Sequence, residues 1–457
     1  MRGLRFVVLI CSLLFPLSLT AAGEVLRGGA AAVELHATDD MIIGGSIFPG
    51  HVRGQEGKLR ACALVLEGPP NGTRIAIVAL DVLMMSRTYL DPAVREASER
   101  TGIPFENILV NCTHTHHAPS TCRVHAYEEV KPFCQQVQKA IVKAIVQATA
   151  ELDKNGPVTI AFGLGKEERV GRNSRLLLSD GTIYWIGPRR DAVRPTGPVD
   201  PDVPVLVLRR RDGSLVATLF GHSVHTIGTL KGAVRSPGFY GLAAQELEAK
   251  HGGVWIFLEG ASGSTHRLDV SAAAAKQMVE KAVLEAFQNA RPISNPVLAA
   301  IKRPFVVRVR HFDEEKEEHA VTSYCRKRVG GERAERIAAV FRRMRQELRP
   351  LQGQERTTWL QTVAVGDVAF VGVPAEFFTV LGVQIKKRSP FQHTVIAELA
   401  NDWIGYVPDR EAYELGGYQV WTGLHSWVAR GTGEAIVDEC VKMLHDLKQK
   451  QRLNKQR

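Results

Sequence analysis

The sequence has few cysteines, seven among 457 residues. Cys11 lies in the apolar N-terminal stretch, and of the other six only Cys112, Cys122 and Cys134 lie near one another. An exported protein would permit a disulfide among these three, but their spacing matches no disulfide framework. We therefore predict isolated thiols.

Long hydrophobic runs are absent after the first 22 residues. Met1–Ala22 combines a basic start, with Arg2 and Arg5, an apolar core and small residues at its end. This pattern predicts a secretory signal peptide cut near Ala22 or Gly23, with an uncleaved membrane anchor as the alternative. We therefore expect an exported protein, periplasmic or secreted.

The chain also lacks internal repeats, low-complexity segments and any linker rich in proline and glycine. Its 457 residues, 45% of them apolar, can bury a large core. Strands alternate with helical segments, which predicts an α/β fold with a mixed β-sheet core and flanking helices. We expect a signal peptide over residues 1–22, a domain over 23–447 with a charged surface insertion between Pro296 and Gln354, and a frayed basic tail over 448–457.

The formal net charge is +10, which raises the question of nucleic-acid binding. Aromatic residues are scarce, however, in the two most basic segments. Arg333–Arg349 contains one aromatic residue, Phe341, and Lys448–Arg457 contains none. This composition argues against nucleic-acid binding. It allows a weak peripheral attraction to anionic membranes.

The most informative stretch is NILVNCTHTHHAPS, at Asn107–Ser120. On an extended strand, side chains two residues apart share a face, so His114 and His116 are predicted to point the same way. Two imidazoles at a strand end are typical of the start of a zinc site. The alternative is a pair of hydrogen-bonded histidines in a polar loop.

Other predicted strands also end in polar residues. Val216–His225 ends in histidine, and the hairpin Thr362–Val373 is followed by Pro374-Ala375-Glu376. Sheets of α/β proteins place their active sites at such strand ends. Gly260–Gly263 indicates a phosphate cradle only weakly, because no P-loop lysine follows.

Three stretches resemble the neutral, non-lysosomal ceramidases. THTHHAP at Thr113–Pro119 is similar to the THTHSGP signature of that family, and VGVPAEFF at Val371–Phe378 to its Pro-Gly/Ala-Glu stretch. NDWIGYVPDREAYELGGYQ at Asn401–Gln419 resembles its segment with two tyrosines, here Tyr406 and Tyr418. The resemblance runs from about residue 26 to residue 444 and covers the catalytic domain, not the C-terminal immunoglobulin-like domain of the longer ceramidases. It implies the ceramidase catalytic-domain fold.

The resemblance implies a zinc ion held by His114, His225, Glu376 and Tyr406, with His222 as the competing choice for His225. Two imidazoles, a carboxylate and a phenolate would leave a position for water, whose pKa zinc can lower to about 7. Each assignment has an alternative. Glu376 could cap the next helix, and Tyr406 could be an ordinary half-buried aromatic residue.

Further residues follow from the same resemblance. His116 would lie beside the zinc ligands or carry a proton, Tyr418 would donate to the oxyanion, and Arg175 would hold a polar group of the substrate. Tyr418 could instead form a core lobe with Trp421 and Trp427.

The sequence departs from the family pattern around these residues. His266, with Ser262 and Ser264 nearby, stands where the family has a serine that contacts the scissile amide. His117-Ala118 replaces a Ser-Gly pair, and an expected Asp is absent from Ser236–Gly241. These departures bear on the substrate more than on the reaction.

Together these features predict a zinc-dependent amidohydrolase that cleaves an N-acyl lipid, such as ceramide, by attack of metal-bound hydroxide. His116 or His266 would return the proton to the leaving amine. One alternative is a zinc hydrolase acting on an ester or on the N-acyl group of an amino sugar. Another is an inactive exported protein that binds sugars or lipids.

Overall fold

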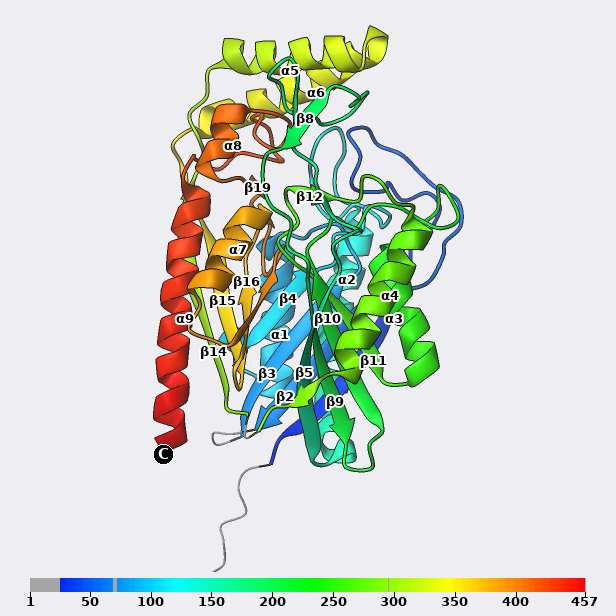
Figure 1. The fold of residues 1–457 in the computed structure, drawn as a ribbon, viewed down its shortest axis with the longest axis vertical. Coiled ribbons are helices and arrows are strands. Elements are labelled where there is room, and N and C mark those ends of the chain that lie inside the picture. The colour runs from blue at the N-terminus through cyan, green and yellow to red at the C-terminus, as the bar shows by residue number, and fades with distance from the viewer. Residues whose placement is uncertain (1–24, 69–71, 295, 457) are drawn as a thin grey trace, which may run out of the picture.

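The computed structural model describes residues 25–68, 72–294 and 296–456, so the predicted signal peptide lies outside the described residues. Three mixed β-sheets with helices on their outer faces form the α/β fold that the sequence predicts (Figure 1). Within these residues, no helix combines the length and apolar character needed to cross a membrane. All six cysteines in the described ranges are buried and free, which confirms the prediction of isolated thiols.

The first sheet has the strand order β1-β2-β3-β4. Its strands are β1 (Arg27–Leu35), β2 (Leu59–Gly68), β3 (Thr73–Leu80) and β4 (Ile108–Cys112). Helices α1 (Arg87–Thr101) and α2 (Lys131–Asn155) cover one face, with η1 (Phe105–Asn107) before β4. Because β2 is buried along its whole length, its sequence is apolar without alternation.

The second sheet has the order β11-β10-β9-β5-β13. Its strands are β5 (Val158–Lys166), β9 (Asp202–Arg210), β10 (Leu215–His222), β11 (Val254–Glu259) and β13 (Arg291–Pro292). Helices α3 (Gly238–His251) and α4 (Ala272–Gln288) cover it. Ser271 caps α4 by accepting a hydrogen bond from the Ala274 N–H.

The third sheet has the order β14-β15-β16-β18. Its strands are β14 (Leu298–Arg308), β15 (Glu355–Val365), β16 (Val368–Gly372) and β18 (His393–Ala397), and α7 (Thr379–Arg388) and α9 (Thr432–Gln456) pack on it. The segment expected to be an insertion therefore contains a strand of this sheet. Only α5 (Glu314–Arg328) and α6 (Gly331–Leu348), followed by η2 (Arg349–Leu351), form a hairpin at one end of the molecule (Figure 1).

The segment expected to be a frayed basic tail continues α9 as far as Gln456. Gln451 is buried, and its side-chain amide donates to the carbonyls of Val297 and Gly366. Lys448 forms an ion pair with Asp367. These contacts fasten the end of α9 to the third sheet.

Short elements complete the fold around the strand ends. They are the pairs β6 (Arg172–Asn173) with β12 (Thr265–His266), β7 (Leu176–Leu178) with β8 (Ala192–Pro195), β17 (Glu376–Phe377) with β19 (Tyr406–Val407), and helix α8 (Arg410–Leu415).

The three sheets share one apolar core. Leu64 and Ile77 of the first sheet, Leu219 of the second, and Val363 and Phe370 of the third belong to the same buried cluster. Each sheet also contains one parallel pair, β3–β4, β10–β11 or β16–β18. The chain segments that follow β4, β10 and β16 carry the polar motifs of the sequence.

Candidate metal centre

His114 and His116 lie in the loop that follows the first sheet. The sequence predicts that they share a strand face, but β4 ends at Cys112, before both of them, so this prediction is wrong. His114 instead has a left-handed backbone with φ of +58°, which is rare for a residue other than glycine. The two rings still meet edge to face at 4.7 Å, and their Nε2 atoms lie 3.3 Å apart.

The second sheet contributes His225. Its ring centroid lies 4.4 Å from that of His114, and ring nitrogens of His114, His116 and His225 all lie within 4.8 Å of one another. The competing residue, His222, is occupied elsewhere. Its Nδ1 lies 2.6 Å from the Tyr240 hydroxyl, and its Nε2 lies 3.3 Å from the carbonyl oxygen of Glu167.

The third sheet contributes Glu376, with Tyr406 directly opposite it in the parallel pair β17–β19. Glu376 Oε2 lies 3.5 Å from Nε2 of His114 and 3.5 Å from Nε2 of His225. The Tyr406 hydroxyl lies 3.1 Å from Nε2 of His225. Helix α7 begins at Thr379 without a side-chain cap, so Glu376 does not cap it.

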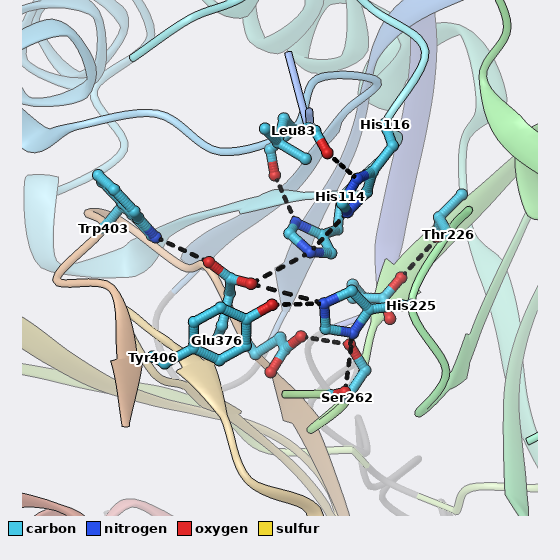
Figure 2. Close-up of polar contacts among 12 residues, drawn as sticks. Leu83, His114, His116, His225, Thr226, Ser262, Glu376, Trp403 and Tyr406 are labelled. Carbon is cyan, nitrogen blue, oxygen red and sulfur yellow. Dashed lines mark hydrogen bonds and ion pairs between the residues drawn. The ribbon is translucent and has the colours of Figure 1, made fainter. Parts of the chain in front are cut away.

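Backbone carbonyls determine which nitrogen of each imidazole carries the proton. Nδ1 of His114 lies 2.9 Å from the Leu83 carbonyl oxygen, Nδ1 of His116 3.1 Å from that of Gly45, and Nδ1 of His225 2.8 Å from that of Ser262 (Figure 2). A carbonyl oxygen only accepts hydrogen bonds, so each Nδ1 must donate. In a neutral ring the lone pair is then on Nε2, and all three Nε2 atoms point toward one another.

Burial reinforces this arrangement. It lowers the pKa of His114 to about 4 and that of His116 well below its usual value, in both cases helped by a neighbouring histidine, so these rings are neutral at pH 7. Burial would raise the pKa of Glu376, but the polar side chains that face it, His225 and the Tyr406 hydroxyl among them, outweigh burial and hold the pKa of the carboxyl group at about 2.

These residues form a donor set suited to a cation. Three imidazole nitrogens and a carboxylate oxygen converge as acceptor atoms. Among these five side chains, only the Tyr406 hydroxyl can donate a hydrogen bond to them. Without a cation, the lone pairs would repel one another in a buried site. Imidazole, carboxylate and phenolate groups are ligands that transition metals accept.

A buried network that sequence analysis missed supports His225. The Ser262 hydroxyl donates to Glu398 Oε1 at 2.6 Å, while the Ser262 carbonyl accepts from the His225 ring. Glu398 Oε2 accepts from the Phe377 N–H at 2.7 Å, next to Glu376. Glu259 and Glu398 are fully buried, and burial raises the pKa of both. Glu259 is the last residue of β11 and Glu398 directly follows β18, and this position at a strand end is the feature that could have indicated them.

His266 lies beside the three-histidine group, on strand β12. Its ring centroid is 4.1 Å from that of His225. Its Nε2 atom is buried and has no hydrogen-bond partner. A polar group of a bound molecule could therefore satisfy this nitrogen.

Tyr418 lies next to Tyr406, with ring centroids 5.8 Å apart. Its hydroxyl is 3.1 Å from Nε2 of His125, a residue that sequence analysis did not single out. Trp421 and Trp427 are 4% and 5% exposed and belong to the core beneath α6 and α9, which favours the core lobe for these two residues.

Arg175 is almost completely buried, and its guanidinium is engaged by protein atoms. It donates to Gln419 Oε1 at 2.9 Å and to the carbonyls of Ala412 and Gly416 at 3.3 and 2.7 Å. Burial lowers its pKa to about 10. These bonds connect Arg175 to the segment that leads to Tyr418.

Comparison with known proteins supports the fold. No protein-family model and no curated protein sequence matches the chain. Among solved structures, the neutral ceramidase from Pseudomonas aeruginosa matches with a TM-score of 0.71 and 19% identity, over 93% of this chain and 75% of that chain. A structure described as ceramidase complexed with C2 matches with a TM-score of 0.70 and 18% identity, over 93% and 76%. The chain therefore has a neutral ceramidase-like fold.

Proposed function

We propose, on the premise of this fold, that the protein is an exported zinc-dependent hydrolase that cleaves the amide bond of an N-acyl lipid of the ceramide type. The observation that carries the proposal is the convergence of three imidazole rings, each with its Nδ1 on a backbone carbonyl, with Glu376 and Tyr406. The names of the similar solved structures suggest the substrate class.

The zinc ion would be held by His114, His225, Glu376 and Tyr406, and the position of His116 adds a third imidazole to this set. When bound, zinc would supply Lewis-acid chemistry, polarising a carbonyl group and lowering the pKa of water. Burial and the nearby Glu376 carboxylate raise the pKa of Tyr406 well above its usual value, so its phenol would lose its proton only on binding a cation.

The residues of the chain orient the reacting groups. The three backbone carbonyls keep the Nδ1 protons of the histidines away from the centre, and the Trp403 indole N–H, 3.3 Å from Glu376 Oε1, holds the carboxylate. In the hydrolysis, the oxygen of water bonds to the carbonyl carbon, the C–N bond breaks, and a proton moves to the leaving nitrogen. We assign the donation of this proton to the leaving nitrogen to His266, whose Nε2 has no hydrogen-bond partner in the protein, or to His116.

Purified protein tests the proposal directly. We expect zinc in elemental analysis and hydrolysis of a short-chain N-acyl sphingosine, lost on chelation and restored by added zinc. A protein that contains zinc but cleaves neither amides nor esters would contradict the enzymatic proposal and favour a binding protein. Cleavage of esters or N-acyl amino sugars alone would support the alternative hydrolase, for which the imidazole of His266 beside His225 is the supporting observation.

Export is tested separately. The predicted signal peptide at Met1–Ala22 supports it. Mass spectrometry of the mature protein should find an N-terminus near Ala22 or Gly23. An intact Met1 on a protein that stays with the cells would contradict release by cleavage.

A further inference from the structure

The hydroxyl group of Tyr418 is bound by His125. The Tyr418 oxygen lies 3.1 Å from His125 Nε2. His125 lies in the loop that follows the histidine motif, where Val124 and Tyr127 pair as an isolated bridge. The direction of this hydrogen bond determines what Tyr418 offers to a substrate.

The environment of His125 sets that direction. Its Nδ1 lies 3.2 Å from the backbone carbonyl oxygen of Ser46, which can only accept. Burial lowers the pKa of His125 to about 4, so the ring is neutral at pH 7 and has a single N–H. That N–H is on Nδ1, and Nε2 must therefore accept. The Tyr418 hydroxyl donates its proton to His125 and keeps its lone pairs for other contacts.

The surrounding residues hold this pair firmly. The Tyr418 ring stacks between the rings of Trp185 and His425. Its ring centroid lies 4.5 Å from that of Trp185, with an interplanar angle of 1°, and 4.7 Å from that of His425, with an interplanar angle of 23°. The Tyr418 carbonyl is 3.0 Å from Nε2 of His425. His125 has a left-handed backbone, with φ of +55°, which a residue other than glycine adopts only where its surroundings enforce it.

Tyr418 also lies next to Tyr406, one of the residues of the candidate metal centre. Its ring meets that of Tyr406 edge to face at 5.8 Å, and the Tyr406 hydroxyl contacts His225. If the Tyr418 hydroxyl turned to donate to an oxyanion, the Nε2 atom of His125 would lose its hydrogen-bond partner. His125 is only 9% exposed. An unpaired buried acceptor is unfavourable, so the donor role that the sequence suggests for Tyr418 conflicts with the position of His125.

We propose that Tyr418 accepts a hydrogen bond from the N–H of the scissile amide, and that His125 is the positioning residue that keeps the Tyr418 proton turned away. The inference rests on the proposed amide hydrolysis and narrows its substrates. A secondary amide has the N–H that Tyr418 would recognise, whereas an ester has none. Tyr418 would thus select secondary amides over esters.

Matched substrates separate an acceptor from an oxyanion donor. The pair is an acyl p-nitroanilide and the p-nitrophenyl ester of the same short acyl chain, tested on the zinc-loaded wild type and Tyr418→Phe. We expect the variant to lose about 10- to 100-fold in kcat/KM on the anilide and less than about threefold on the ester. Its zinc content should equal that of the wild type.

Equal losses on the two substrates would overturn the inference and restore the oxyanion role, because both reactions form an oxyanion. That result would leave the proposed hydrolase intact. A wild type that cleaves neither substrate would overturn the proposed function and the inference with it.

Variants of His125 provide an independent check. His125→Gln places an acceptor oxygen near the position of Nε2 and should retain most of the preference for the anilide. His125→Leu should lose it, and the double variant with Tyr418→Phe should be no worse than either single variant. A purely structural role for His125 would instead lower both reactions equally and add to the effect of Tyr418→Phe, which would contradict the inference.

Discussion

The Nε2 atoms of His114 and His116 lie 3.3 Å apart, and the Nδ1 protons of both rings are held by backbone carbonyls. Two facing lone pairs at this distance need a positive charge between or beside them. This relationship leads to the first prediction, which concerns metal content.

His114→Ala, His116→Ala and Glu376→Gln should each lower the zinc-to-protein ratio measured by elemental analysis, because each removes a donor atom from the converging set. His51→Ala changes an exposed histidine and serves as the control. Loss of zinc in His114→Ala but not in His116→Ala would assign His116 to a role beside the metal. Wild-type zinc in all three variants would contradict the site.

A second prediction concerns Arg175, whose buried guanidinium connects three acceptors. Lysine cannot reproduce this fork, so Arg175→Lys should lower the free energy of unfolding by on the order of 2–4 kcal/mol. Arg172→Lys, at a more exposed neighbour, is the control. Denaturant titration measures both. Unchanged stability with a raised KM would instead support the substrate contact that the family resemblance implies.

The third prediction concerns His266, beside His225. As the proton donor to the leaving nitrogen, its loss in His266→Ser should lower kcat by roughly 10²–10⁴-fold while the zinc content stays constant. If its ring only narrows the site, His266→Ser should keep kcat on short substrates and accept bulkier N-acyl groups. Kinetics over a series of acyl chain lengths distinguishes these results. No change in kcat or in substrate range would contradict both roles.

The fourth prediction follows from Asp81, a buried carboxyl group that accepts from the Arg60 N–H and the Thr113 hydroxyl. Burial raises its pKa from 3.8 to about 6, although Arg60 opposes the shift. Between these pH values the folded state binds more protons than the unfolded state, so this group's contribution to stability falls as the pH rises. By pH 7 the raised pKa of Asp81 lowers the free energy of unfolding by roughly 3 kcal/mol.

Asp81→Asn removes this titration; its amide oxygen can still accept from the Arg60 N–H, and its NH2 group can donate to the Thr113 hydroxyl in place of the second bond. Relative to the wild type, the free energy of unfolding of the variant should therefore increase between pH 4 and pH 7. Glu99→Gln, an exposed change, should show no such trend. A difference between Asp81→Asn and the wild type that is independent of pH would contradict the raised pKa.

The fifth prediction concerns membranes. Arg342 and Arg345 of α6 form ion pairs with Glu318, and Arg345 pairs also with Glu314. Because their charge is largely compensated, we expect only weak sedimentation with anionic vesicles, lost at high salt where charges are screened over a few ångströms. Strong sedimentation that persists in high salt would indicate insertion of apolar residues instead.

The sequence by itself determined the fold class and the residue types of the candidate site. Alternating strands and helices indicated the α/β architecture, and the motifs at His114, Glu376 and Tyr406 named residues that the structure brings within a few ångströms of one another. The local sequence pattern was sufficient to identify these residues, because polar residues at the ends of apolar strands are recognisable without knowledge of their partners.

The tertiary structure decided which residues meet and in which protonation state. The sequence could not choose between His222 and His225, since both lie at the end of the same strand. The choice depends on contacts with Tyr240 and Ser262 from other segments. The sequence pattern predicted that His114 and His116 share a strand face. In the structure, a loop in which His114 has a left-handed backbone brings the two rings together. The role of Tyr418 depends on His125, which lies 293 positions away. Hydrogen-bond direction depends on both partners, and partners distant in sequence are brought together only by folding.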